Sequence, residues 1–418
     1  MESLRLEEFN HWWIKGHVDT DLALEFKRDI YKEAELQLEN RFVIGFIGLR
    51  RTGKTTLMYQ LIKKLIDEYI PPERILFFSF DDNTSNLEDV IKTYLEIQMK
   101  DLRDERIFIF LDEIQKCSNW QNMLKKYYDL YPKIKFIISG SESLFLRKKT
   151  KETLAGRIIE LHFTPFTFIE YLNVLGITEN NMKYETIIGP LFMKFIKKGG
   201  FPETFSIEDK RYFNEYIRAL VVDKILYKDI PKLFKIDDPS ILSVLLELIS
   251  TTPGIYIDYL SLSKQFGKDR RVIKDYISYL ENSFLIRLMS NYRKGSASKL
   301  RKRKRAYPID NALIYLYKNE IDEIMFSRMV ETFVINKLNA ISFWKNGNEI
   351  DAISNDVPIE VKYQENITTF DIKPIREFMK KFKIKKGIII TKKDQRIIET
   401  EDGIITLVPA WKWAIEQT

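Results

Sequence analysis

Short and almost purely apolar runs of strand length punctuate the first part of the chain. They lie at 42–47, 75–80, 107–111, 134–138 and 158–163. Stretches with helical periodicity separate them, such as TTLMYQLIKKLIDEY at 55–69. Buried strands that alternate with amphipathic helices are typical of an α/β fold. The pattern therefore predicts a parallel sheet covered by helices on both faces.

The rest of the chain is organised differently. Residues 166–235 have a mostly helical pattern, and 240–289 predict short helices that end in the strand-like FLIRLMS. A second α/β pattern follows: a helix near 322–340, a hairpin at 341–363, a helix near 371–382 and a strand at 387–391. These changes of pattern divide the chain into four expected parts, 1–165, 166–238, 239–310 and 311–418.

Composition narrows the class of protein. Hydrophobic residues make up 45% of the 418 residues and aromatic residues 13%, so there is ample material for packed cores. The single cysteine, Cys117, excludes a disulfide within the chain. The N-terminal MESLRLEEFNHWW does not resemble a signal peptide, and no run approaches the roughly 18 apolar residues of a membrane span. We expect a soluble, cytoplasmic protein with no membrane partner.

The positive charge of the chain is concentrated in one place. Between Tyr292 and Tyr307 lie eight basic residues and no acidic one, and this local excess is larger than the net charge of +7. The basic character is therefore a property of one segment and not of the whole chain.

A phosphate-binding motif follows the first predicted strand. The segment from Gly48 to Thr55 matches G-x-x-x-x-G-K-S/T at every fixed position, between a strand and an amphipathic helix. Backbone N–H groups of such a loop face the phosphates, the lysine reaches the β- and γ-phosphates, and the hydroxyl binds Mg²⁺. The expected nucleotide-binding residues are Gly48, Leu49, Arg50, Arg51, Thr52, Gly53, Lys54, Thr55 and Thr56.

An acidic pair completes the expected ATP site. The apolar strand IFIFL delivers Asp112 at its carboxyl end, where ligands bind in parallel α/β sheets. We expect Asp112 to hold Mg²⁺ with Thr55, and Glu113 to act as general base towards the attacking water. An acidic pair after a strand can also be a solvated turn, but the motif upstream favours catalysis. The intervening strand at 75–80 is typical of the additional-strand ATPases.

Two further polar residues are candidates for the same reaction. Ser139 ends the fourth predicted strand and could sense the γ-phosphate, although turn serines are common. Arg157, in LAGR before the fifth strand, stands where oligomeric ATPases carry an arginine finger that acts on the neighbouring subunit. A surface arginine at a helix end is the alternative.

Taken together, these motifs resemble an archaeal and bacterial family of AAA-type (AAA_14-like) ATPases with a C-terminal DUF4143-like region. The residues that carry the resemblance are GLRRTGKTTL, FLDEIQ with Trp120, ISGSES, LAGR, TPFTFIEYL, GGFPE, GNEIDAI and IEVKY. The resemblance implies an AAA-type core, a helical lid, a winged-helix-like segment and a fold similar to PD-(D/E)xK nucleases. From the phosphate-binding motif and the acidic pair we expect ATP and Mg²⁺ as cofactors, and we also expect a homo-oligomer.

The C-terminal part carries a nuclease-like spacing of residues. Asp351, Glu360 and Lys362 follow the pattern D-x8-E-x-K, and Asn346-Gly347 predicts a tight turn before them. Two adjacent strands would bring the carboxylates together as metal ligands, with Lys362 beside them and Glu331 on the preceding helix. The pattern is loose in a chain with 30% charged residues. The site could equally be degenerate and serve only binding.

A nucleic-acid surface is expected before this module. A basic helix start and a basic run follow each other in the sequence, and a winged helix presents such a helix to the major groove. A solvated charged loop is the alternative. The expected contacts are Arg270, Arg271, Lys274, Arg301, Lys302, Arg303, Lys304 and Arg305.

These observations predict an ATP hydrolase that binds and processes DNA, RNA not being excluded. Two other hypotheses remain open: an ATP-dependent signalling switch with an inactive nuclease-like domain, and a remodeller of proteins.

Overall fold

The computed structural model describes residues 6–81, 85–98, 105–140, 153–177, 180–234, 236, 238–293 and 304–416. The chain divides into two compact units, Met1–Thr164 and Pro165–Thr418. Among the described residues, no helix is long and apolar enough to cross a membrane.

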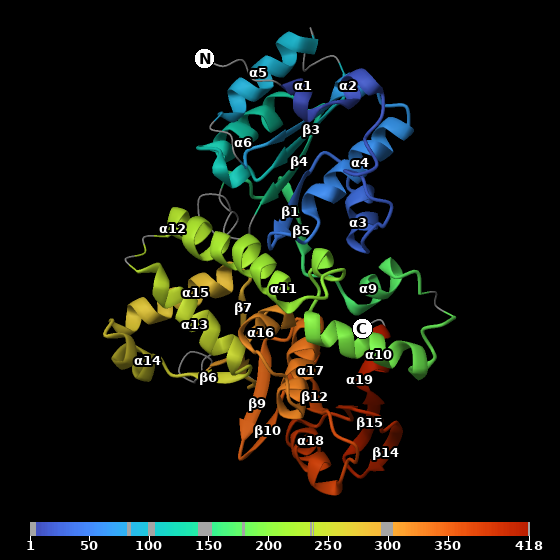
Figure 1. Cartoon of the computed structure of the whole chain (residues 1–418), viewed down its shortest axis with the longest axis vertical. Coiled ribbons are helices and arrows are strands. Elements are labelled where there is room, and N and C mark those ends of the chain that lie inside the picture. The colour runs from blue at the N-terminus through green and yellow to red at the C-terminus, as the bar shows by residue number, and fades with distance from the viewer. Residues whose placement is uncertain are drawn as a thin grey trace. The chain divides into compact units, whose positions relative to one another are not determined.

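The first unit is built on a five-stranded parallel sheet (Figure 1). The strands are β1 (Val43–Gly48), β2 (Ile75–Ser79), β3 (Ile107–Asp112), β4 (Ile134–Gly140) and β5 (Ile158–Phe163). Their order is β2-β3-β4-β1-β5, so β4 is inserted between β1 and β3. The five strands expected from the apolar runs are confirmed, with ends that differ by no more than two residues. Because all five run parallel, the loops after β1 and β3 emerge at the same edge of the sheet.

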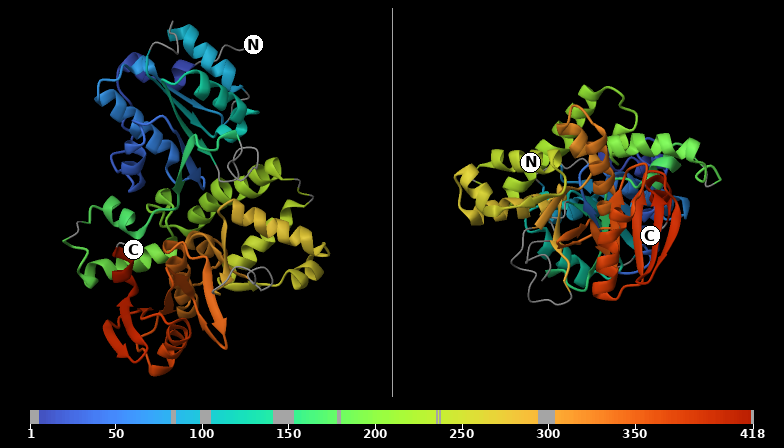
Figure 2. Two further views of the ribbon diagram at one scale, coloured as in Figure 1. Left: turned by 180° about the vertical axis from the view of Figure 1, so that it is seen from behind. Right: turned by 90° about the horizontal axis from the view of Figure 1, so that it is seen from below.

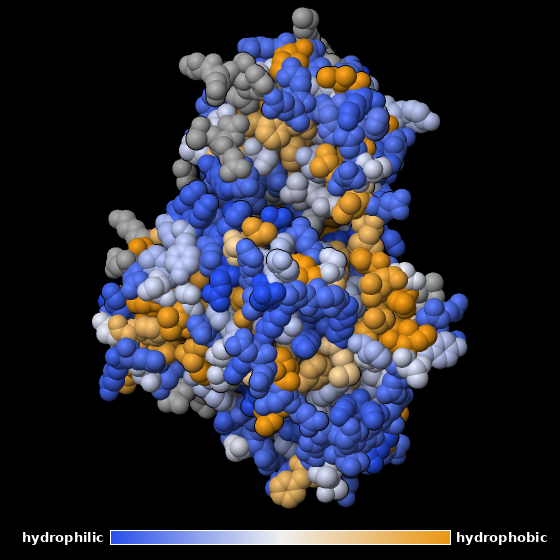
Figure 3. Space-filling view, viewed as in Figure 1, coloured by the Kyte–Doolittle hydropathy of each residue, from blue (hydrophilic) through white to orange (hydrophobic). Residues whose placement is uncertain are grey.

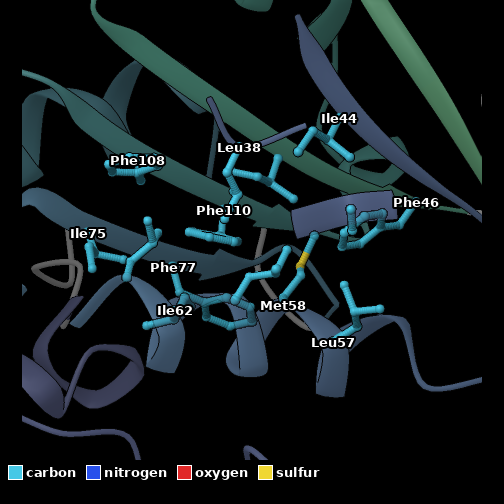
Figure 4. Close-up of a cluster of buried hydrophobic side chains, with 14 of the residues drawn as sticks. Leu38, Ile44, Phe46, Leu57, Met58, Ile62, Ile75, Phe77, Phe108 and Phe110 are labelled. Carbon is cyan, nitrogen blue, oxygen red and sulfur yellow. The ribbon is translucent and has the colours of Figure 1, made fainter. Parts of the chain in front are cut away.

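Helices cover both faces of this sheet, as Figure 1 shows. They are α3 (Ile30–Leu36), α4 (Lys54–Asp67), α5 (Leu87–Gln98) and α6 (Trp120–Leu130). Apolar residues of α4 such as Leu57, Met58 and Ile62 pack against Phe77 and Phe110 of the sheet in one buried cluster (Figure 4). This packing fixes the start of α4 against the carboxyl end of β1.

The N-terminal segment covers the edge strand β2. It contains the short helices α1 (Leu6–Phe9) and α2 (Trp12–Lys15). The Asn10 side chain donates to the Phe77 carbonyl at 2.9 Å and accepts from the Phe77 N–H at 2.6 Å. The indole nitrogens of Trp12 and Trp13 both donate to the Ile75 carbonyl. Backbone groups that an edge strand would leave unpaired are thereby satisfied by side chains.

The second unit begins with helices. They are α9 (Phe168–Val174), α10 (Glu185–Lys198), α11 (Lys210–Ile217) and α12 (Ile230–Leu233), with π-helical turns at Arg218–Val222 and Ile225–Asp229. This agrees with the helical pattern of 166–235. Exposed apolar side chains gather on the α9–α10 segment, where Figure 3 shows a hydrophobic surface; they include Val174, Leu175, Ile187 and Met193.

A mixed sheet with five helices follows. Its strands, in the order β10-β9-β7-β8-β6, are β6 (Ile255–Ile257), β7 (Ile286–Asn291), β8 (Lys304–Pro308), β9 (Ser342–Asn346) and β10 (Asn348–Ile350). The helices are α13 (Pro239–Thr251), α14 (Tyr259–Phe266), α15 (Arg270–Asn282), α16 (Asn311–Tyr317) and α17 (Glu323–Lys337). Strand β8 pairs antiparallel with both β6 and β7, and β7 pairs parallel with β9.

The last sheet closes the second unit, and Figure 2 shows its strands side by side. It contains β11 (Ala352–Ser354), β12 (Val357–Lys362), β13 (Lys386–Thr391), β14 (Arg396–Thr400) and β15 (Gly403–Pro409), with α18 (Thr369–Phe382) and α19 (Ala410–Ile415). The single hairpin expected at 341–363 is in fact two antiparallel pairs, β9–β10 and β11–β12, which belong to different sheets. The chain changes sheets at Asp351, between β10 and β11.

Candidate functional site

The loop after β1 has the geometry of a phosphate cradle. Strand β1 ends at Gly48 and α4 begins at Lys54, so the loop leads directly to the N-terminus of a 14-residue helix. A Cβ at Gly48 would lie 2.1 Å from the Phe163 carbonyl oxygen, so only glycine allows this approach of β1 to β5. Helix N-termini carry unpaired N–H groups and positive potential, which suit an anion.

The Lys54 side chain turns back over this loop. Its ammonium donates to the carbonyl oxygens of Gly48 at 3.0 Å and Leu49 at 2.7 Å, and the residue is buried. The charge is therefore held above the loop, at the place where the β- and γ-phosphates of a nucleotide would lie.

Three side chains from three elements meet beside the loop. The Thr55 hydroxyl, on α4, donates to Asp112 Oδ2 at 2.8 Å, and the Ser139 hydroxyl, on β4, donates to Asp112 Oδ1. Asp112 and Ser139 are buried. A carboxylate beside a hydroxyl fits Mg²⁺, which is usually held by one or two protein oxygens together with substrate phosphates and water. Within the described residues, no group of three or more His, Cys, Asp or Glu side chains could hold a metal ion alone.

Glu113 is set at the rim of this group. It adopts a left-handed backbone conformation, with φ at +52°, and its N–H donates to the Ser139 hydroxyl at 3.1 Å. Its carboxylate accepts from Gln115 Nε2 at 2.5 Å and lies 3.8 Å from Arg50 Nη2. Arg50 also lies 3.9 Å from Asp81, which follows β2. Arg50 thus lies close to two acidic residues beside the loop, Glu113 and Asp81, and the loop motif does not specify these contacts.

Arg28 is a contact of the loop that sequence reasoning missed. Its Nη1 donates to the Thr52 carbonyl and to the Thr164 carbonyl, both at 2.9 Å. It therefore ties the phosphate loop to the end of the first unit. Arg28 lies 24 positions before Thr52 in the chain, outside any motif, so no local signal could have revealed the contact.

Arg157 lies at the opposite end of the strands from the phosphate loop. Its carbonyl accepts from the Val43 N–H at 2.8 Å, at the amino ends of β1 and β5, whereas the phosphate loop follows the carboxyl end of β1. Its guanidinium donates to both carboxylate oxygens of Asp129 at 3.0 and 3.2 Å. Arg157 is thus remote from the phosphate loop of its own chain.

Asp351, Glu360 and Lys362 do come together in the second unit. The Asp351 N–H donates to Glu360 Oε2 at 3.2 Å, and the Val361 N–H donates to Asp351 Oδ2 at 3.0 Å. Lys362 Nζ lies 2.8 Å from Glu360 Oε1. Burial, with the Asp351 charge beside it, raises the pKa of Glu360 well above its usual range. The antiparallel pairing of β11 with β12 explains the contact.

The expected metal ligands Asp351 and Glu360 are each paired with a cation. Arg305 Nη1 lies 3.4 Å from Asp351 Oδ1, and Lys362 Nζ lies 2.8 Å from Glu360 Oε1. The structure therefore gives no support to a metal-dependent nuclease.

The expected nucleic-acid contacts fall into three groups. Arg270, Arg271 and Lys274 are exposed near the start of α15, and Lys304 is half-buried. Arg305 is only 3% exposed, so its expected role as a surface contact is wrong. The reason is that β8 lies between β7 and β6 in its sheet and is covered on both faces, since Arg305, Ala306 and Tyr307 are all buried. Residues 301–303, the remaining expected contacts, lie outside the described residues.

Comparisons with known families agree with the phosphate-loop geometry. Residues 40–172 match the AAA domain family (AAA_14), residues 190–321 a domain of unknown function (DUF8612), and residues 326–413 another domain of unknown function (DUF4143). The first unit thus carries an AAA-type P-loop ATPase domain, for which nucleotide binding is implied. The AAA-type and DUF4143 parts of the expected resemblance are confirmed, whereas the DUF8612 match was not anticipated.

Several relatives match most of the chain. Two uncharacterised proteins of Methanocaldococcus jannaschii are 27% and 29% identical to it; the matches cover 92% and 93% of this chain and 91% and 88% of those proteins. An uncharacterised protein of Haemophilus influenzae is 23% identical, over 72% of this chain and 78% of its own length.

Solved structures match less closely. Cdc6p from Pyrobaculum aerophilum is 13% identical, with a TM-score of 0.31 over 76% of this chain and 98% of that one. Orc1 from Aeropyrum pernix, solved in complex with DNA, is 12% identical, with a TM-score of 0.33 over 76% and 97%. These likenesses are too low to carry an argument about function.

Proposed function

We propose that this chain hydrolyses ATP with Mg²⁺ at the phosphate loop and uses its second unit to bind DNA. The observation that supports hydrolysis best is the convergence of Lys54, Thr55, Asp112 and Ser139, which arrive from the start of α4 and from two strands. The match of residues 40–172 to the AAA domain family supports the same reaction.

The residues divide the work of the reaction. Lys54 would neutralise the β- and γ-phosphates, and Thr55 with Asp112 would hold Mg²⁺, which would supply positive charge to the developing transition state. Glu113 removes a proton from the attacking water, and Ser139 orients both acids through its hydrogen bonds. Arg50 and Gln115 restrain the Glu113 carboxylate before substrate arrives.

The DNA-binding half of the proposal rests on the region around α15. The order α13, β6, α14, α15, β7, β8, with β8 pairing antiparallel to both other strands, is that of a winged helix. In such a fold the third helix enters the major groove. Three exposed basic residues lie near the start of α15. Asp269 caps the first turn of this helix by accepting a hydrogen bond from the Arg271 N–H at 2.7 Å.

An ATPase assay tests the first half. Lys54→Ala should abolish ATP binding in an equilibrium assay with a fluorescent ATP analogue. Unchanged hydrolysis by this variant would refute the site. Stimulation of the wild-type ATPase by DNA would favour coupling, whereas stimulation by unfolded protein and not by DNA would favour the remodeller hypothesis.

A matched pair of variants tests the second half. Replacing Arg270, Arg271 and Lys274 by alanine should weaken DNA binding and lower the salt slope by about one for each phosphate that is no longer neutralised. The control replaces Lys373, Lys380 and Lys383, three lysines of the α18 region, and removes the same charge. Equal effects in both variants would show only a nonspecific influence of net charge, and unchanged affinity in the first would refute the α15 surface.

A further inference from the structure

Arg305 lies on β8 in the second unit, and its guanidinium is almost fully engaged. Nε donates to the Gly254 carbonyl at 3.2 Å. Nη2 lies 2.7 Å from Glu331, and Nη1 lies 3.0 Å from Glu349 and 3.4 Å from Asp351. The side chain is 3% exposed. One cation is thus shared by three carboxylates that come from α17, β10 and the start of the last sheet.

The side chains around Arg305 suit a flat guanidinium. The central carbon of the Arg305 guanidinium, Cζ, lies over the rings of Tyr307, Phe343 and Tyr256, at 5.1, 5.8 and 6.0 Å from their centroids. Gly254 adds room, because a Cβ there would lie 2.6 Å from Arg305 Nη2. Aromatic faces attract a weakly hydrated planar cation. They offer none of the oxygen ligands that a hydrated Mg²⁺ ion requires.

The carboxylates are also satisfied without a metal. Glu331 Oε1 accepts from Arg305 and, at 2.6 Å, from the Tyr307 hydroxyl, while Oε2 accepts from Arg328 at 3.3 Å. Glu349 Oε2 accepts from Lys345 at 2.9 Å. The charge that a divalent ion would supply to neighbouring acids is thus already supplied by side chains.

We propose that Arg305 is the resident cation of this acidic cluster and stands in the place of a divalent metal ion. The second unit then binds neither Mg²⁺ nor Mn²⁺ at Asp351 and Glu360, and it does not cut DNA. Arg305 instead fastens β8 to the last sheet.

Counting bound Mn²⁺ by electron paramagnetic resonance tests this proposal without reference to ATPase activity. The full-length wild type, measured without nucleotide, should bind as many Mn²⁺ ions as Asp351→Asn. Arg305→Gln should bind one ion more, and the double variant Arg305→Gln with Asp351→Asn should lose that extra ion. Any Mn²⁺ ion bound at the phosphate loop is bound by all four proteins, so it does not affect the difference in ion count between any two of them.

Two results would overturn the proposal. One is a wild type that binds one ion more than Asp351→Asn; the other is a folded Arg305→Gln that gains none. If Arg305→Gln does not fold, the wild-type and Asp351→Asn pair decides alone. In parallel, the wild type should nick supercoiled plasmid with Mg²⁺ or Mn²⁺ no faster than Asp351→Asn, and faster nicking counts against the proposal.

Discussion

Removing the Arg305 charge should destabilise the second unit strongly. In Arg305→Met at pH 8, above the pKa of Glu331 of about 7, the side chain keeps a similar length, but the Glu331 carboxylate loses its 2.7 Å partner while it stays buried. Breaking a buried ion pair by removing one partner costs about 3–5 kcal/mol, because the remaining charge is left uncompensated. Arg328 does not replace the missing charge, since its side chain is 49% exposed and its contact with Glu331 is longer, at 3.3 Å.

This cost converts into a measurable melting shift. For a unit of this size, 1 kcal/mol lowers Tm by about 2–4 °C, so the expected drop is about 6–20 °C. Differential scanning calorimetry of the full chain should show it in one of two transitions. The transition of the first unit is identified by its rise with a nonhydrolysable ATP analogue, because a ligand stabilises the state that it binds.

Two comparisons decide whether the ion pair is responsible. Arg271→Met removes an exposed arginine and should cost less than about 0.5 kcal/mol, or about 2 °C. Arg305→Met combined with Glu331→Gln should recover part of the stability, because the uncompensated charge is gone. The reasoning is refuted if Arg305→Met melts like Arg271→Met, or if the double variant is destabilised by the full sum of the two single effects.

Three further outcomes are expected. Glu113→Gln should bind ATP almost normally but lower turnover about 10²–10⁴-fold in single-turnover kinetics, and an unchanged rate would exclude it as the base. If Arg157 acts on a neighbouring subunit, specific activity should rise with protein concentration, and Arg157→Ala should lose this rise while Asp129→Ala, which breaks the same ion pair, keeps it. Burial raises the pKa of Glu331 from its usual 4.5 to about 7, so the folded state holds a proton that the unfolded state lacks. The stability from this group is therefore complete below about pH 4.5 and is lost as pH rises through 7, and Glu331→Gln should flatten that slope in urea denaturation between pH 5 and 7.5.

The proposed ATP site could largely be predicted from local sequence. The phosphate loop is one contiguous strand–loop–helix segment, so its glycines, Lys54 and Thr55 define their own geometry wherever the segment folds. Asp112 could be added because a parallel sheet brings the carboxyl ends of its strands to one edge. Asp351 and Glu360 were paired correctly for a similar reason, since only a short turn separates their strands.

Only the tertiary structure decided what surrounds these residues. In the sequence Arg305 is the last of five consecutive bases, and nothing local distinguishes it from Lys304. The pairing of β8 with β6 and β7 turns Arg305 inwards, towards acids that lie 26, 44 and 46 positions further along the chain. Arg28 reaches the phosphate loop through a comparable long-range contact. The sequence shows that a residue is charged, but which residue pairs with it depends on the elements that the folded chain brings together.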